Sequence, residues 1–229
     1  MRRAKVFFAA CGCTVVVTLA AFPHRTAAQS AGLTDTVGMV VCSKDVDGRT
    51  RISRGTGAVV GSRSTVLTVA HNFVSRGRRS GPVRFEATDC VFRQLDAEGE
   101  TIAEVAFESG VFGDYSLNFA LPNEDWAVLK TAEPLVLIEP LPFSAVRLDE
   151  IDGARMPIEL VAFRSERWRG PTSLMFSTGE LFTVDYIGVR RLAHTAETDR
   201  MSSGAAIVAT IADGRRAVVG IHRSSAEFG

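Results

Sequence analysis

Apolar residues occur in short runs along most of the chain, and none of these runs after the N-terminal segment keeps a 3.6-residue period long enough to predict a helix. The runs are rich in Val, Ile, Thr and Phe, and they are separated by Gly, Asp, Asn, Ser and Pro, which is typical of strands joined by turns. The expected strands form two groups: Val37–Cys42, Arg51–Val60, Thr65–Ala70, Val83–Cys90, Thr101–Phe107 and Trp126–Thr131, then Phe143–Leu148, Pro157–Phe163, Leu174–Val184, Gly188–His194, Gly204–Ile211 and Ala217–Arg223.

A proline-containing stretch separates the two groups, and Pro134, Pro140 and Pro142 favour an extended connection over another strand. Six strands, a connection and six strands predict an all-β chain with two six-stranded antiparallel β-barrels, since closure removes exposed strand edges. The predicted domains are 29–133 and 134–229. The chain ends soon after the last strand, so we expect that the second barrel could be incomplete at its C-terminus.

The first residues have a different composition. Arg2, Arg3 and Lys5 precede the uncharged apolar segment Val6–Phe22, and small residues follow it, as in a secretory signal peptide. We expect residues 1–28 to be removed and the protein to be secreted or periplasmic. The alternative is an uncleaved anchor, for which an apolar segment interrupted by Gly12 is of marginal length.

Composition narrows the function further. The chain has 26 basic and 26 acidic residues, and a balanced charge removes the main electrostatic driver of nucleic-acid binding. Outside the predicted signal only Cys42 and Cys90 remain, and an even pair in an exported protein predicts one disulfide, with two buried thiols as the alternative. The basic segment Ser75–Gly81 is interpreted as a solvated loop, although it could also bind polyanions.

Three residues carry candidate chemistry. His71 follows an apolar strand in the sequence Thr68-Val69-Ala70-His71, and Asp125 precedes another one in Asp125-Trp126-Ala127-Val128-Leu129. Ser203 is followed by Gly204 and then by small and β-branched residues, which suits a hydroxyl presented at a tight turn. Each residue alone is weak evidence for catalysis, because His71 could simply cap a strand, Asp125 could be a solvated turn residue, and Ser203 could be an ordinary turn residue. Their order over two groups of strands favours a catalytic set.

With these motifs the chain resembles the chymotrypsin-like (trypsin-fold) serine peptidases, in particular their bacterial glutamyl-endopeptidase-like branch. The resemblance extends over 37–223. It includes Gly57–His71, the aspartate motif, the nucleophile segment Thr198–Ile207 and the pocket strand at Gly220-Ile221-His222. It implies a double barrel and the family order of His, Asp and Ser.

The resemblance also implies a mechanism. Ser203 would attack a peptide carbonyl, His71 would act as the base and Asp125 would orient it, with the backbone N–H groups of Met201 and Ser203 as the oxyanion hole. No metal or organic cofactor is required. Thr198 and His222 match positions that hold an acidic substrate side chain in glutamyl endopeptidases, whereas Glu197 would favour Lys or Arg, so specificity stays open.

Two departures from the family pattern motivate an alternative: Met201 stands where the family has Gly, and the chain ends soon after the pocket strand. A side chain at position 201 is expected to add strain if the backbone needs a glycine-like conformation there. Ser202 stands where trypsin-type enzymes have Asp, which favours the bacterial branch as the model. The leading hypothesis is a secreted serine endopeptidase that acts on protein or peptide substrates. We expect a monomer that binds no nucleic acid and is not stably inserted in a membrane after signal removal. The alternative is a peptidase-fold binding protein with little or no turnover.

Overall fold

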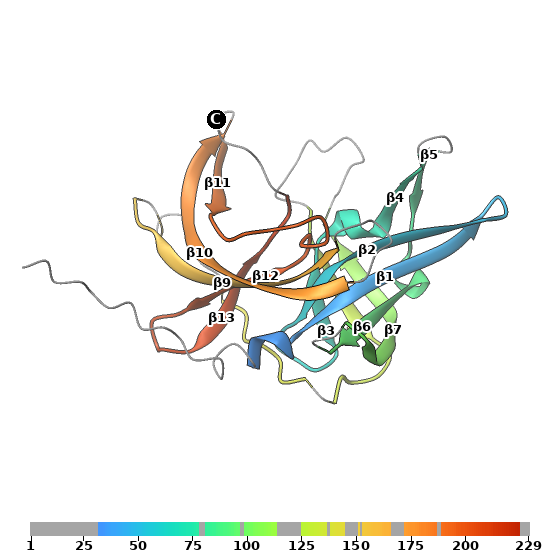
Figure 1. Cartoon of the computed structure of the whole chain (residues 1–229), viewed down its shortest axis with the longest axis horizontal. Helices are drawn as coiled ribbons and strands as arrows, with labels where there is room; N and C mark the ends of the chain where they lie inside the picture. Colours follow the sequence, from blue (N-terminus) through green and yellow to red (C-terminus); the bar gives the residue numbers. More distant parts are fainter. Residues whose placement is uncertain are drawn as a thin grey trace, which may run out of the picture.

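The computed structural model describes residues 32–77, 81–96, 99–113, 125–136, 138–144, 151, 153–165, 172–186 and 189–224, so the predicted signal peptide lies outside the described residues. Strands dominate, and Figure 1 shows them gathered in two β units that lie side by side. The prediction of an all-β double barrel is confirmed at the level of the fold. Within the described residues, no helix is both long and apolar enough to cross a bilayer.

The first unit is a closed barrel with the strand order β1-β2-β3-β8-β7-β6. Alternate residues of its strands point inward, which builds a core around side chains such as Val40, Val66, Phe92 and Leu129. The bounds of the strands are β1 Val37–Val46, β2 Arg49–Val59, β3 Thr65–Thr68, β6 Cys90–Leu95, β7 Thr101–Phe112 and β8 Ala127–Thr131.

Two expectations for this unit need correction. The ends of the segment interpreted as a solvated basic loop belong to a hairpin, because β4 (Val74–Gly77) pairs with β5 (Gly81–Arg84), and 78–80 lie outside the described residues. The predicted strand Val83–Cys90 is interrupted by a 3₁₀ helix, η2 (Ala87–Asp89), which a capping box between Glu86 and Asp89 stabilises. The barrel strand β6 therefore begins only at Cys90, where the predicted strand ends.

The second unit is a curled antiparallel sheet of five strands in the order β11-β10-β9-β12-β13. Its predicted sixth strand, Phe143–Leu148, is reduced in the described residues to a bridge between Phe143 and Val218, and 145–150 lie outside them. The described part of this unit is thus a partial barrel. The bounds are β9 Met156–Ser165, β10 Thr172–Tyr186, β11 Val189–His194, β12 Ala206–Thr210 and β13 Arg216–Ile221.

A shared apolar core joins the two units. Met39 and Ala58 of the first barrel pack in one buried cluster with Phe163, Met201 and Val208 of the second unit. This buried contact holds the two units together at the junction where the candidate site lies.

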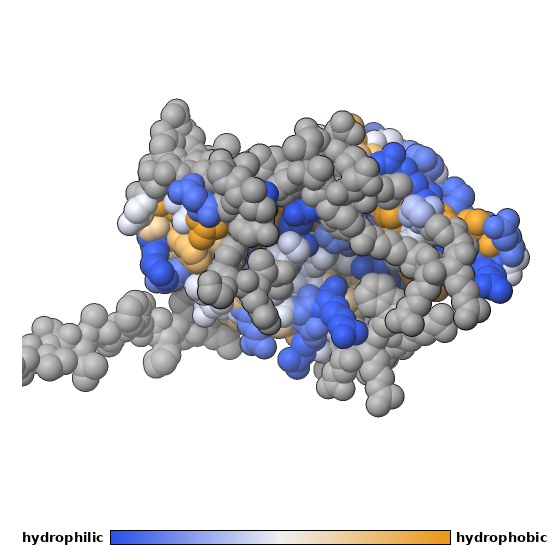
Figure 2. All heavy atoms as spheres, turned by 90° about the horizontal axis from the view of Figure 1, so that it is seen from above, coloured by the Kyte–Doolittle hydropathy of each residue, from blue (hydrophilic) through white to orange (hydrophobic). Residues whose placement is uncertain are grey.

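On the face drawn in Figure 2, hydrophobic and hydrophilic areas of the described surface are interspersed.

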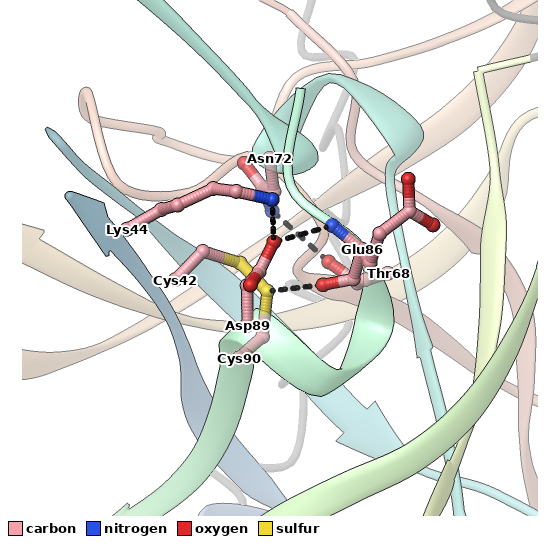
Figure 3. Close-up of a disulfide and its surroundings, with 7 residues drawn as sticks. All are labelled: Cys42, Lys44, Thr68, Asn72, Glu86, Asp89 and Cys90. Atoms are coloured by element: carbon pink, nitrogen blue, oxygen red, sulfur yellow. Dashed lines mark hydrogen bonds and ion pairs between the residues drawn. A yellow bond between two sulfur atoms is a disulfide. The ribbon is translucent and has the colours of Figure 1, made fainter. Parts of the chain in front are cut away.

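The predicted disulfide is confirmed: Cys42 and Cys90 are bonded, with their Cα atoms 4.0 Å apart (Figure 3). They are directly opposite each other in the antiparallel pairing of β1 with β6, so the bond connects two neighbouring strands of the barrel. Beside it, the Nζ atom of Lys44 lies 2.9 Å from Oδ2 of Asp89. The alternative of two buried thiols is excluded.

Candidate active site

Strand pairing brings His71 next to Asp125. In the antiparallel register Thr68 of β3 is opposite Ala127 of β8, so the residue that follows β3 and the residue that precedes β8 lie at the same edge of the barrel. His71 sits there in the 3₁₀ helix η1 (Ala70–Phe73). Its Nδ1 lies 2.8 Å from Oδ2 of Asp125, and its backbone N–H donates to Oδ1 at 2.9 Å.

The Asp125 carboxylate is almost completely buried, with 1% of its side chain exposed. Burial alone would raise its pKa, but the hydrogen bonds and charge of His71 and a hydrogen bond from Arg223 together lower the pKa of Asp125 below its ordinary value. The group is therefore a carboxylate at neutral pH. It can hold the imidazole in one orientation, with Nδ1 toward the carboxylate and Nε2 directed elsewhere.

Arg223 is a member of this site that the sequence reasoning missed. It follows β13 of the second unit, and its Nε donates to Oδ2 of Asp125 at 2.9 Å, with 25% of its side chain exposed. No motif marks this position. The signal that could have found it is its place directly after His222, at the end of the predicted pocket strand.

Ser203 contacts the backbone of Arg223. Its Oγ donates to the backbone carbonyl of Arg223 at 3.3 Å. The next residue, Gly204, has φ +89° and donates its N–H to the carbonyl of His222 at 2.8 Å. One residue, Arg223, thus contacts the Asp125 carboxylate through its side chain and the Ser203 hydroxyl through its backbone.

Polar groups of the first barrel also hold the Ser203 loop. The Ser203 carbonyl accepts hydrogen bonds from the backbone N–H of Thr56 at 2.9 Å and from Nδ2 of Asn72 at 3.1 Å. Asn72 also donates to Oγ1 of Thr68 at 3.0 Å, as Figure 3 shows. The sequence reasoning missed both Thr56 and Asn72. Only their places in the sequence could have pointed to them, since Asn72 directly follows His71 and Thr56 lies between Gly55 and Gly57.

Met201 is accommodated without a left-handed backbone. Its side chain is 5% exposed in the shared core, and its carbonyl accepts a hydrogen bond from Oγ1 of Thr56 at 2.7 Å. Among the described residues other than glycine, only Asp47 has a positive φ, so the strain expected for a side chain in a glycine-like conformation does not arise at Met201. Within the described chain, the backbone N–H groups of Met201 and Ser203 donate no hydrogen bond.

The three candidate substrate-binding residues differ in exposure. Glu197 is exposed, with its backbone N–H donating to Oγ of Ser177 at 2.7 Å, and Thr198 is half-buried. His222 is 5% exposed, and its Nδ1 lies 2.9 Å from Nε2 of His194. Burial and then the nearby His194 and His71 lower the pKa of His222 to about 4, so its imidazole is neutral at pH 7.

The described residues contain no group of three or more His, Cys, Asp and Glu side chains positioned to hold a metal ion. The side chains that the structure brings together at the junction of the two β units are an alcohol (Ser203), an imidazole (His71), a carboxylate (Asp125) and a guanidinium (Arg223).

This double-barrel fold is that of bacterial serine proteases, as three solved structures demonstrate. A thermostable serine protease from an extremophilic microorganism has a TM-score of 0.61 and 16% identity, covering 85% of this chain and 87% of that one. A Glu endopeptidase has a TM-score of 0.57 and 15% identity, covering 84% and 80%. The protease Anisep from Arthrobacter nicotinovorans has a TM-score of 0.56 and 12% identity, covering 86% of each chain.

The sequence itself matches no protein-family model and no curated protein. At identities this low, the likeness to the solved proteases establishes the chymotrypsin-like fold, and the activity has to be argued from the site.

Proposed function

We propose that this protein is a serine endopeptidase that hydrolyses peptide bonds through Ser203, His71 and Asp125. The observation that carries the proposal is the bond of 2.8 Å between Nδ1 of His71 and the buried carboxylate of Asp125, at the junction where the second unit supplies Ser203. A fold shared with serine proteases supports the same activity.

In the proposed reaction the Ser203 hydroxyl turns from the Arg223 carbonyl toward Nε2 of His71, which takes its proton as Oγ attacks the peptide carbonyl carbon. The tetrahedral intermediate collapses when the imidazolium protonates the leaving amine, which leaves an acyl-enzyme ester on Ser203. Water then attacks the ester with His71 again as the base, and the acid product and the free serine are released. Asp125 keeps the tautomer and stabilises the imidazolium.

The backbone N–H groups of Met201 and Ser203 are the proposed donors to the oxyanion. Both are without a hydrogen bond in the described chain, and the Met201 carbonyl is held by Thr56, which fixes the loop before the reaction begins. A backbone donor that meets the developing oxyanion is worth about 100- to 1000-fold in rate. This arrangement argues against the alternative of a binding protein without turnover, which is not favoured.

We further propose that Glu197, Thr198 and His222 contribute to substrate binding. Because His222 is neutral at pH 7 and paired with His194, it would offer a substrate side chain a neutral hydrogen bond. Protein or peptide substrates follow from the proposed activity. The bond between Cys42 and Cys90 supports an oxidising compartment, so we propose a secreted or periplasmic protein exported by residues 1–28.

The proposal is tested with a fluorophosphonate probe, which labels only an activated serine. The wild-type protein is expected to be labelled, and peptide mapping should locate the probe on Ser203. Ser203→Ala should lose the label and hydrolysis together. Ser202→Ala is the matched control, because the neighbouring hydroxyl is buried and accepts a hydrogen bond from the Asp199 N–H. Absence of label on well-folded wild-type protein between pH 6 and about 9 would reject the proposal.

A further inference from the structure

One oxygen of the Asp125 carboxylate has two donors. Oδ2 accepts Nδ1 of His71 at 2.8 Å and Nε of Arg223 at 2.9 Å, while Oδ1 accepts the backbone N–H of His71. His71 and Asp125 belong to the first barrel, and Arg223 reaches them from the end of β13 in the second unit. A guanidinium and the imidazole therefore share the carboxylate oxygen that orients the base.

A guanidinium carries its charge at every working pH, so its effect on this pair is permanent. It compensates part of the negative charge of Asp125 and repels a positive charge on the His71 ring. Because the Asp125 side chain is 1% exposed, solvent screens these interactions less than it would at the surface. An imidazolium at His71 is therefore less stabilised than it would be beside Asp125 alone.

The same contact also has a structural consequence. A charge-assisted hydrogen bond from Arg223 fixes the carboxylate against His71, and it does so across the junction between the two units. The backbone carbonyl of Arg223 contacts Oγ of Ser203, so this residue connects the two ends of the proposed triad. Among the described residues, His222 also senses the charge of His71, and it is buried and neutral at pH 7.

We propose that Arg223 is a positioning residue that restrains the triad: it holds Asp125 in place for His71 and withdraws part of the charge that stabilises the imidazolium. As a result, the imidazolium that forms on His71 during the reaction is less stabilised than it would be beside Asp125 alone, and the maximal rate is lower than Asp125 alone would support. This inference rests on the proposed serine peptidase function and adds a control on its pH range.

The test compares pH–rate profiles of wild type and Arg223→Gln, which loses the charge but keeps the backbone carbonyl that faces Ser203. The acid limb of kcat/KM should move to higher pH by about one unit, because a neighbouring charge at this distance shifts such a titration by roughly one to three units. The glutamine amide can still donate a hydrogen bond to the Asp125 carboxylate, so the positioning is kept while the charge is lost. kcat on the alkaline plateau should therefore rise about three- to tenfold, while KM changes little.

Two further variants separate charge from structure. Arg223→Lys keeps the positive charge, and its acid limb should stay at the wild-type position. Arg216→Gln is the matched control, since Arg216 is also about one-quarter exposed and pairs at 2.7 Å with a buried carboxylate, that of Glu159, in the second sheet. Its acid limb should coincide with that of wild type.

A measurement that needs no turnover accompanies these profiles. NMR signals of the His71 ring report its protonation directly, and in Arg223→Gln the imidazolium form should persist about one pH unit higher than in wild type. The inference would be overturned if Arg223→Gln left both the acid limb and the pH range of the imidazolium signals unchanged. A fall in kcat without a shift of the acid limb would also overturn it. If wild type binds no fluorophosphonate, the proposed function fails, and the NMR comparison still decides the role of Arg223.

Discussion

Gly204 lies directly against the backbone of Thr56, a residue of the other β unit. A Cβ atom at position 204 would be 2.1 Å from the Thr56 carbonyl oxygen and 2.2 Å from Oγ1 of Thr68, and φ at Gly204 is +89°. The residue after the proposed nucleophile is thus a point of very close approach between the two units. A glycine is required there for both its conformation and its size.

Gly204→Ala is expected to destabilise the protein by at least about 2 kcal/mol, because a left-handed backbone costs an alanine roughly 1–2 kcal/mol and the clash with a backbone oxygen adds to it. Urea unfolding measures the change. Gly214→Ala is the matched control: Gly214 has φ +82°, and a Cβ atom there would meet nothing within 4 Å, so only the conformational part should appear. Equal losses in the two variants would contradict the contact with Thr56.

Asn72 is expected to position Ser203, because its Nδ2 donates both to the Ser203 carbonyl and to Thr68. Asn72→Ala should lower kcat about 10- to 100-fold with little change in KM, since small displacements of a nucleophile have effects of this size. Asn72→Asp should lower it further by placing a carboxylate against the Ser203 carbonyl. Gln94→Ala, at a buried amide on β6, is the control and should keep the wild-type kcat. A loss of kcat at Gln94 as large as at Asn72 would refute the positioning role.

His222 is expected to make stability depend on pH. Burial and its histidine neighbours lower its pKa to about 4 in the folded protein, below the ordinary value of 6.5, so the unfolded chain binds the extra proton. The contribution of neutral His222 to the free energy of unfolding is complete above pH 6.5 and is lost as the pH falls toward 4. The loss amounts to about 2 kcal/mol between pH 7.5 and 5.

Urea unfolding at pH 7.5 and 5 checks this expectation in wild type and in His222→Gln. The wild-type protein should lose stability on acidification, and the variant should lose about 2 kcal/mol less. Gln94→Ala is the control, because it changes a buried side chain that does not titrate, and it should leave the difference between the two pH values as in wild type. An unchanged pH difference in His222→Gln would contradict a buried neutral imidazole at that position.

The site residues that could be predicted from the sequence differ from those that were missed in where their partners lie. His71 and Asp125 each adjoin an apolar strand, and antiparallel pairing brings the ends of neighbouring strands together, so their proximity could be expected from the sequence. Thr56, Asn72 and Arg223 act across the junction of the two units. Their partners are backbone carbonyls and one carboxylate oxygen, which leave no periodicity or spacing to detect.

The same reasoning explains the errors in the fold. The alternation that predicts a strand at Val83–Cys90 is present, but the local capping hydrogen bonds of Glu86 and Asp89 favour a 3₁₀ turn at that point. The basic composition of Ser75–Gly81 predicts a loop, yet Ser75 pairs with Val83 in a hairpin, because the backbone hydrogen bonds of an antiparallel pair do not depend on the charge of the side chains.

Removal of the disulfide is expected to lower stability without changing the site. The bond closes a loop with a sequence separation of 48, for which the chain-entropy model gives about 4 kcal/mol. The double variant Cys42→Ser, Cys90→Ser should therefore unfold at a clearly lower urea concentration, and fluorophosphonate labelling of the folded fraction should be retained.

Lys44→Ala controls for local disturbance beside the disulfide, because the ion pair of Lys44 with Asp89 lies next to it and is partly exposed. Pairs of this kind contribute about 0–1 kcal/mol, so the variant should stay close to wild type. If the double serine variant were as stable as Lys44→Ala, the cross-link would not restrict the unfolded chain, and the closed barrel would have to hold β1 against β6 through its hydrogen bonds and apolar core alone.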